Sequence, residues 1–144
     1  MIDVQKLRSD FPILAREVNG KQLVYLDNGA SSQKPQIVIA AISNAYSNEY
    51  SNVHRGLHYL SNLATDNYEN VRSIVQKFLC AEFEEEIVFT SGTTEGINLA
   101  AYAWGMEHLK SGDEIILSVM EHHANVVPWH FLRERYGIKI KWVD

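Results

Sequence analysis

The sequence predicts an α/β fold in which parallel strands alternate with helices, preceded by helices at the N-terminus. Two short apolar runs, Glu86–Thr90 and Glu114–Ser118, are typical of strands buried in a sheet. The alternating stretch Ile138–Val143 predicts a third strand. The two intervals between these strands, 93–109 and about 124–136, show the periodicity of helices. Strands separated by helices and short connections favour parallel pairing.

The preceding part, residues 1–85, is expected to be mostly helical. Apolar residues recur at helical spacing after Lys34-Pro35, and again from about Ser61 to Leu79. The polar stretch Ser47–His58 separates these two helices. We expect residues 86–144 to be the first, incomplete part of an α/β domain, because the face of the last strand still needs a cover.

Composition indicates a soluble globular protein. The 144 residues are 46% hydrophobic. The net charge is −5, and charges of both signs are mixed along the chain, which argues against binding to nucleic acid or to an anionic membrane. No apolar run approaches a membrane span, and the N-terminus lacks the apolar core of a secretory signal. The single cysteine, Cys80, excludes an internal disulfide framework, so we expect a cytoplasmic location. Its apolar neighbours predict that Cys80 is a small buried residue and no nucleophile.

Two polar motifs follow predicted strands at their carboxyl ends. Ser91–Asn98 follows the first strand, and Met120–Asn125 follows the second. Ligands of open parallel sheets bind outside the carboxyl ends of the strands. If the strands are parallel, both motifs therefore face one crevice.

The first motif suits an anion. A turn of small residues that enters a helix leaves several backbone N–H groups without partners, and the helix dipole adds positive potential. Thr93 and Thr94 would offer amides and hydroxyls to a phosphate, whereas the side chain of Glu95 must point away from it. The alternative is an ordinary helix cap by Ser91 or Thr93 with no ligand.

The second motif contains the adjacent histidines His122 and His123. Adjacent residues do not share a helix face, so the pair is poorly placed to hold a metal. One imidazole could present its flat ring to a planar ligand, and the alternative is a pair of partly buried structural histidines. Together with the neighbouring anion site, the motif favours a planar phosphorylated ligand.

A third cluster, His54–His58, lies in the polar stretch. Arg55 is a candidate for a carboxylate or phosphate fork. His54 and His58 could hold a metal if this segment were helical, but Gly56 weakens such a helix. The alternative is a solvated or interface loop.

Several segments together resemble the SufS-type cysteine desulfurases of the class V aminotransferase family. They are Phe11-Pro12, Tyr25–Ser31, Gln33–Pro35, Val53–His58, Glu69–Arg72, Phe89–Asn98 and Met120–Trp129. The resemblance covers essentially the whole chain in order. Glu-His-His-Ala-Asn with Pro-Trp separates this group from the IscS-type branch.

The resemblance implies part of the large domain of a fold-type I transferase that uses pyridoxal 5′-phosphate. It implies that Thr93 and Thr94 bind the cofactor phosphate and that His122 stacks on the pyridine ring. Asn28 and Ala30 belong to a segment that resembles the lining of the substrate pocket. Arg55 resembles a residue at the edge of the active site, near a subunit interface.

The implied reaction takes sulfur from L-cysteine, leaving alanine and an enzyme persulfide for iron–sulfur cluster assembly. The implied partners are a sulfur acceptor of the SufE or SufU kind and a second copy of the enzyme. No metal site is implied.

The catalytic lysine of the family follows a Ser/Gly-x-His motif, and none of the seven lysines here lies in one. The resemblance also places the nucleophilic cysteine and the arginine that binds the substrate carboxylate outside these residues, and Cys80 does not occupy the position of the nucleophile. We therefore expect this chain to be an N-terminal segment that is inactive alone, with no catalytic residue of its own. Alternatives are a non-catalytic oligomerising or assembly module, a selenocysteine lyase-type member of the family, and a metal-binding protein using His54, His58, His122 and His123.

Overall fold

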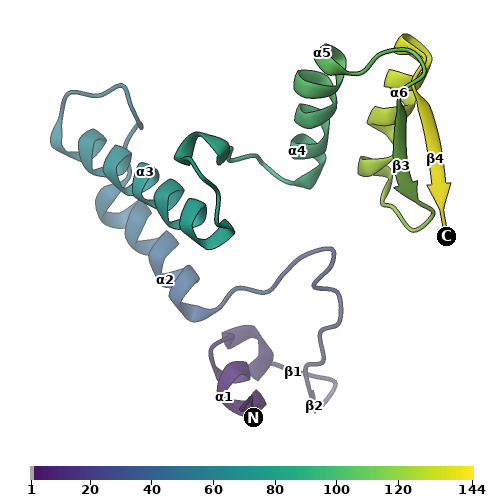
Figure 1. Ribbon diagram of the computed structural model, residues 1–144. Coiled ribbons are helices and arrows are strands. Elements are labelled where there is room, and N and C mark those ends of the chain that lie inside the picture. Colours follow the sequence, from purple (N-terminus) through teal and green to yellow (C-terminus); the bar gives the residue numbers. More distant parts are fainter. Residues whose placement is uncertain (1) are drawn as a thin grey trace. The chain divides into compact units, whose positions relative to one another are not determined.

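A computed structural model describes residues 2–144, and the chain divides into two compact units, Met1–Glu84 and Glu85–Asp144. Figure 1 shows the elements of each unit in chain order.

The first unit begins with short elements. They are α1 (Val4–Ser9), a 3₁₀ turn (Pro12–Ala15), and the antiparallel strands β1 (Glu17–Val18) and β2 (Lys21–Gln22). Asp3 caps α1 by accepting hydrogen bonds from the backbone N–H groups of Gln5 and Lys6. Asn19 and Gly20, which join the two strands, both have positive φ, at 53° and 71°. Tight hairpin turns require this conformation, which Asn and Gly adopt most readily.

Two longer helices complete the first unit. They are α2 (Gln36–Asn44), which continues as a π-helical turn over Ala45–Glu49, and α3 (Tyr59–Leu79). Pro35 directly precedes α2, and the non-helical segment 50–58 joins the π-helical turn to α3. Both predicted helices and the interruption between them are therefore confirmed.

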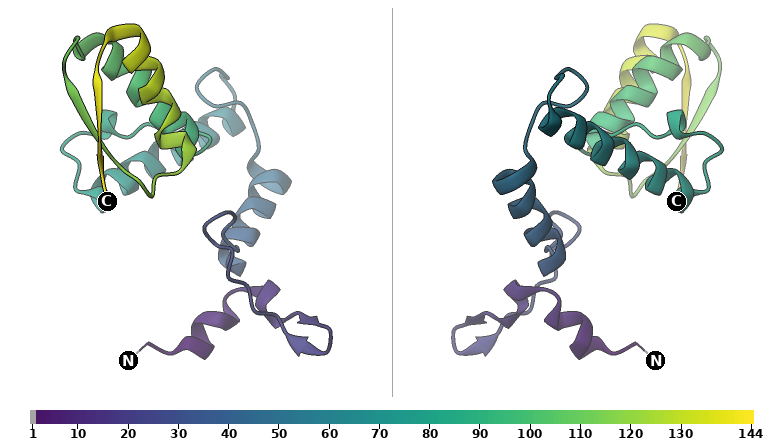
Figure 2. Two further views of the ribbon diagram at one scale, coloured as in Figure 1. Left: turned by 90° about the vertical axis from the view of Figure 1, so that its right-hand side faces the viewer. Right: turned by 90° about the vertical axis from the view of Figure 1, so that its left-hand side faces the viewer.

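The second unit contains the parallel sheet. Its elements are α4 (Thr93–Leu99), a π-helical segment (Ala100–Gly105), α5 (Met106–His108), β3 (Glu114–Ser118), a 3₁₀ turn (His123–Asn125), α6 (Val127–Tyr136) and β4 (Lys139–Val143). β3 and β4 pair in parallel, in a register that runs from Glu114 opposite Lys139 to Ser118 opposite Val143. The views in Figure 2 show the two strands side by side with α6 beside them. The last two predicted strands and their parallel pairing are confirmed.

The first predicted strand is wrong. Glu84–Glu86 forms a 3₁₀ turn, and residues 87–90 belong to no strand. A strand exists only where its backbone forms a ladder with a neighbouring strand. The one parallel ladder among the described residues joins β3 to β4. Ile87 is nevertheless buried, as the apolar run predicts.

The core of the second unit lies between its helices and the two strands. Ala101, Leu132 and Ile138 are at most 2% exposed. The partly buried side chains that pack against them are Met106, Leu109, Ile115, Trp129 and Tyr136. The burial expected for the strand Glu114–Ser118 is only partly correct, because Leu117 is buried while Ile116 is 69% exposed.

Cys80 corrects a further prediction, since it is exposed and not buried. It ends α3 in the left-handed conformation, with φ at 56°. Its neighbours Phe78 and Leu79 are themselves largely exposed, so they give the thiol no apolar cover. Within residues 2–144 the structure has no helix that is both long and apolar enough to span a membrane.

Candidate functional site

The start of α4 presents free backbone donors. Gly96 donates the first intrahelical hydrogen bond, to the carbonyl of Gly92, so the N–H groups of Thr93, Thr94 and Glu95 precede the helical ladder. Gly92 stands at the N-cap and has no side chain that could occupy these amides. Thr93 and Thr94 are exposed. An anion can therefore reach both amides and both hydroxyls.

Ser91 and Glu95 fix the turn that leads into α4. Both the hydroxyl and the backbone N–H of Ser91 donate to Glu95 Oε2, each at 2.5 Å. These hydrogen bonds lower the pKa of the Glu95 carboxyl below its ordinary value. The N-cap residue of α4 is Gly92, so neither Ser91 nor Thr93 caps the helix through its side chain, and the Glu95 carboxylate has partners of its own.

A chain of side-chain hydrogen bonds holds the loop between β3 and α6. Ser118 Oγ donates to Glu121 Oε1 at 3.1 Å, and Asn125 Nδ2 donates to Glu121 Oε2 at 2.9 Å. Trp129 Nε1 then donates to Asn125 Oδ1 at 2.9 Å. The bonds from Asn125 and Ser118 lower the pKa of Glu121. The loop is thus tied to the end of β3 on one side and to α6 on the other.

His122 lies at the centre of this loop. It is exposed, and its Nδ1 accepts a hydrogen bond from the backbone N–H of Ala124 at 3.1 Å. In the neutral ring, the proton therefore lies on Nε2. The ring of His123 stands edge-on to it, with an interplanar angle of 83° and centroids 6.2 Å apart. The backbone bond orients the His122 imidazole, as a stacking residue requires.

The two motifs of the second unit lie next to each other. α4, which begins at Thr93, is in contact with the 3₁₀ turn His123–Asn125. The helix start that can bind a phosphate and the imidazole that can cover a planar ring therefore belong to neighbouring elements. The fit with pyridoxal phosphate rests on the exposed amides of Thr93 and Thr94 and on the oriented ring of His122.

Asn28 and Ala30 lie in the first unit, on an irregular segment with its own hydrogen bonds. Asn28 Oδ1 accepts from the backbone N–H of Gln33 at 3.3 Å, and the Ala30 N–H donates to the carbonyl of Asp27 at 3.2 Å. The Tyr25 hydroxyl donates to the carbonyl of Ser31 at 2.6 Å. A cavity of about 290 Å³ opens here, lined by Arg8, Phe11, Leu14, Tyr25, Asn28 and Gln33.

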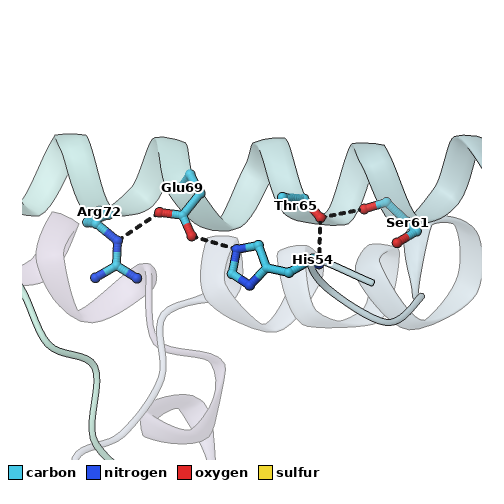
Figure 3. A network of polar contacts seen from close by, with 5 residues as sticks. All are labelled: His54, Ser61, Thr65, Glu69 and Arg72. Carbon is cyan, nitrogen blue, oxygen red and sulfur yellow. Dashed lines mark hydrogen bonds and ion pairs between the residues drawn. The ribbon is translucent and has the colours of Figure 1, made fainter. Parts of the chain in front are cut away.

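Arg55 also lies in the first unit, on the loop 52–58 that precedes α3. Its neighbour His54 has a positive φ of 67° and donates its backbone N–H to Thr65 Oγ1 at 2.9 Å. The His54 ring contacts Glu69 Oε1 through Nε2 at 2.7 Å (Figure 3). Arg72 Nε donates to the other oxygen of Glu69 at 2.7 Å. Arg55 itself is exposed.

The hydrogen bonds made by Glu69 shift its own pKa and that of Arg72. The hydrogen bonds from Arg72 and His54 lower the pKa of Glu69, and the bond to Glu69 raises the pKa of Arg72. His54 and His58 do not converge on a metal position, because His54 binds Glu69 while His58 Nδ1 accepts from the Ser61 N–H. Among residues 2–144, no three metal-ligating side chains lie together.

Thus α4, which begins with Thr93 and Thr94, contacts the turn that follows His122, whereas Asn28, Ala30 and Arg55 lie in the other unit. Sequence reasoning missed the residues that hold these loops. Glu121 and Asn125 lie in a motif in which we singled out only the histidines. The Ser61, Thr65 and Glu69 side chains recur every four residues along α3, a spacing that places them on one face and could have revealed them.

Comparison with known proteins identifies the relatives of this chain. The sequence profile of the aminotransferase class-V family matches residues 24–144. A curated cysteine desulfurase from Salmonella newport is 56% identical over 138 residues, which are 96% of this chain and 34% of that protein. The chain therefore spans about a third of the length of this curated relative.

Solved structures agree with this assignment. The apo structure of a cysteine desulfurase from Thermococcus onnurineus superposes with a TM-score of 0.85 at 38% identity, covering 100% of this chain and 34% of that one. A C-DES mutant with glycine covalently linked to its PLP cofactor superposes with a TM-score of 0.70, covering 94% of this chain and 32% of that one. At 20% identity, the second likeness indicates the fold alone.

Proposed function

Because this chain belongs to the aminotransferase class-V family, we propose that it provides the phosphate- and ring-binding part of a pyridoxal-phosphate-dependent cysteine desulfurase. The observation that carries this proposal is the contact between α4 and the turn that follows His122. A phosphorylated aromatic cofactor needs an anion site close to a flat surface. The contact joins the helix that offers the anion site to the turn that follows the flat ring of His122.

The candidate residues of the second unit each have a separate role. The amides and hydroxyls of Thr93 and Thr94 hold the phosphate, helped by the positive end of the helix dipole. His122 covers the ring, while Glu121 and Asn125 keep the loop in place. When bound, pyridoxal phosphate would withdraw electrons from the amino acid substrate.

The residues to which the proposal gives a role in substrate binding belong to the first unit. Asn28 and Ala30 line the substrate pocket through a segment that its own hydrogen bonds hold in shape. Arg55 offers a fork to a carboxylate or a phosphate, since a guanidinium forms two parallel hydrogen bonds with either group. The substrate is L-cysteine, and the products are alanine and a persulfide.

Finer features follow from the resemblance described above. We propose the SufS type, with a sulfur acceptor of the SufE or SufU kind, a homodimeric enzyme, a role in iron–sulfur cluster assembly, and a cytoplasmic location. The 144 residues tested by themselves should be inactive, because none of their lysines lies in the family's lysine motif.

A chimera tests the proposal. This chain replaces the aligned third of the Salmonella cysteine desulfurase, and alanine formation from L-cysteine is measured with and without added pyridoxal phosphate. We expect cofactor-dependent activity in the chimera and none in the 144 residues alone. His122→Ala and the double variant Thr93→Val, Thr94→Val should lower cofactor affinity.

Asn67→Ala, at an exposed position of α3 that has no role in the proposal, serves as the control and should leave cofactor affinity unchanged. A folded chimera that retains pyridoxal phosphate but forms no alanine would refute the desulfurase assignment. Unchanged cofactor affinity in both site variants would refute the roles given to the threonines and His122.

A further inference from the structure

Asn125 is the residue at which the hydrogen bonds of the His122 loop meet. Its backbone N–H donates to the carbonyl of His122 at 2.8 Å. Its side chain uses both ends of the amide, since Nδ2 donates to Glu121 Oε2 and Oδ1 accepts from Trp129 Nε1, each at 2.9 Å. One residue therefore joins the backbone of His122 to Glu121 before it and to Trp129 in α6.

The partners of Asn125 are themselves held by the rest of the second unit. Glu121 also accepts a hydrogen bond from Ser118 Oγ, at the end of β3. Directly after β3, the Val119 N–H donates to the carbonyl of Val143 in β4 at 3.0 Å. The Trp129 side chain packs against the buried core. The loop between β3 and α6 is thus attached to the sheet at one end and to the core at the other.

Asparagine suits this position because its short amide offers a donor and an acceptor at once. Aspartate would keep the acceptor for Trp129, but its second oxygen would face the Glu121 carboxylate, and two carboxylates in contact repel each other. The side chains that form the chain of bonds, Ser118, Glu121, Asn125 and Trp129, are all partly buried. Water therefore replaces a lost partner only in part.

We propose that Asn125 and Trp129 are positioning residues that connect His122 to the core and hold its imidazole in place for the pyridine ring of pyridoxal phosphate. They act together with the Ala124 N–H, which donates to His122 Nδ1 at 3.1 Å. The connection to the cofactor rests on the function proposed above, whereas the fixed loop rests on the hydrogen bonds alone. A ring that is held before the cofactor arrives loses less freedom on binding, which improves affinity.

Reversal of the hydrogen bond between residues 121 and 125 tests the fixed loop in the 144-residue chain at neutral pH. Asn125→Asp alone places two carboxylates in contact and should accelerate exchange of the Ala124 N–H by about three- to tenfold. With Glu121→Gln added, an amide at 121 donates to the carboxylate at 125, and each side chain keeps an oxygen for Ser118 or Trp129. The double variant should therefore regain protection. Equal exchange in Asn125→Asp and the unchanged chain, or no recovery in the double variant, would overturn the fixed loop.

Trp129→Phe tests the connection to the core. It keeps an aromatic ring among the core side chains but removes the indole N–H that binds Asn125, so exchange of the Ala124 N–H should again rise by about three- to tenfold. Trp104→Phe is the matched control in the same unit, because the Trp104 ring stacks on His108 and makes no bond to the loop. Equal exchange in the two variants would overturn the role of Trp129.

The active chimera described above tests the connection to the cofactor. Asn125→Asp and Trp129→Phe should each weaken pyridoxal phosphate binding by about three- to tenfold, and Glu121→Gln should restore the affinity of Asn125→Asp. In a double-mutant cycle, Trp129→Phe should add little once His122 is alanine. Unchanged affinity in the single variants, or fully additive effects in the cycle, would overturn the positioning role. Unchanged affinity in His122→Ala would instead refute the role proposed for the His122 ring, even if the exchange experiments confirm the fixed loop.

Discussion

In residues 85–144 several apolar side chains are buried, with Leu132 only 1% exposed, whereas in the described part of residues 1–84 the one buried residue is Ser61. Burial of a leucine side chain contributes about 1.5–3 kcal/mol, while a typical hydrogen bond contributes a net of about 0.5–1.5 kcal/mol. The second unit is therefore organised around an apolar core. In the first unit, the loop that carries Arg55 is held by hydrogen bonds to α3. The candidate residues of the two units are thus held in place by different forces.

The largest effect should follow truncation of the core. Leu132→Ala should destabilise the second unit by about 2–5 kcal/mol, because it leaves a cavity among residues that cannot fill it. All three tryptophans, Trp104, Trp129 and Trp142, lie in this unit, so denaturant unfolding followed by their fluorescence reports it alone.

The matched change in the first unit is Ile42→Ala in α2, where the side chain is 52% exposed. Its effect on the stability of the first unit, followed by the loss of helical circular dichroism from α2 and α3 in denaturant, should stay within about 0.5 kcal/mol. Equal destabilisation by the two substitutions would contradict the contrast between the units.

Gly56→Ala should have the second-largest effect. The new Cβ would overlap Ser61 and push the loop away from α3, at a cost of about 1–3 kcal/mol. NMR should show lost amide protection at His54 and Gly56, with unchanged tryptophan fluorescence. Gly29→Ala is the control, because a Cβ there would meet nothing within 4 Å. Unchanged amide protection at His54 and Gly56 in Gly56→Ala would show that the close approach of Gly56 to Ser61 is not required.

Acid should loosen the His122 loop. The folded-state pKa of Glu121 is lowered, so the ionised carboxylate contributes stability above its unfolded-state pKa and loses it as the pH falls through the folded-state value. The Trp129 indole N–H, which binds Asn125, should shift with the carboxyl carbon of Glu121 in one NMR titration.

Glu121→Gln tests this connection. Its amide faces two donors, Ser118 and Asn125, with only one acceptor oxygen, so the loop should be looser at neutral pH and should lose its response to acid. A Trp129 signal that still titrates in this variant would show that another group controls the loop.

The smallest effect should come from the surface ion pair between Lys141 and Glu114, whose atoms lie 3.4 Å apart on the two parallel strands. Both side chains are more than half exposed, so water screens the pair. Lys141→Gln should change stability by no more than about 0.5 kcal/mol in the tryptophan assay. A larger loss would mean that the sheet relies on charge as well as on its core.

Local patterns in the sequence predicted the helices and the β3–β4 pair, because their periodicity reflects which face is buried. The Asn19-Gly20 turn carried a clear signal that the sequence analysis did not use. The run 87–90 resembles a strand in composition, yet strand formation depends on a neighbouring ladder that local sequence does not specify. Cys80 was misjudged because its apolar neighbours in sequence do not cover it in space.

The central claim is that the start of α4 and His122 together bind a phosphorylated pyridine ring. NMR titration of the 144-residue chain with pyridoxine 5′-phosphate tests it, since this compound lacks the aldehyde that would react with surface lysines. We predict saturable shifts of the Thr93 and Thr94 amides and of the His122 ring with one common affinity, and much weaker shifts with pyridoxine. Shifts confined to other residues, or equal responses to the two compounds, would contradict the claim.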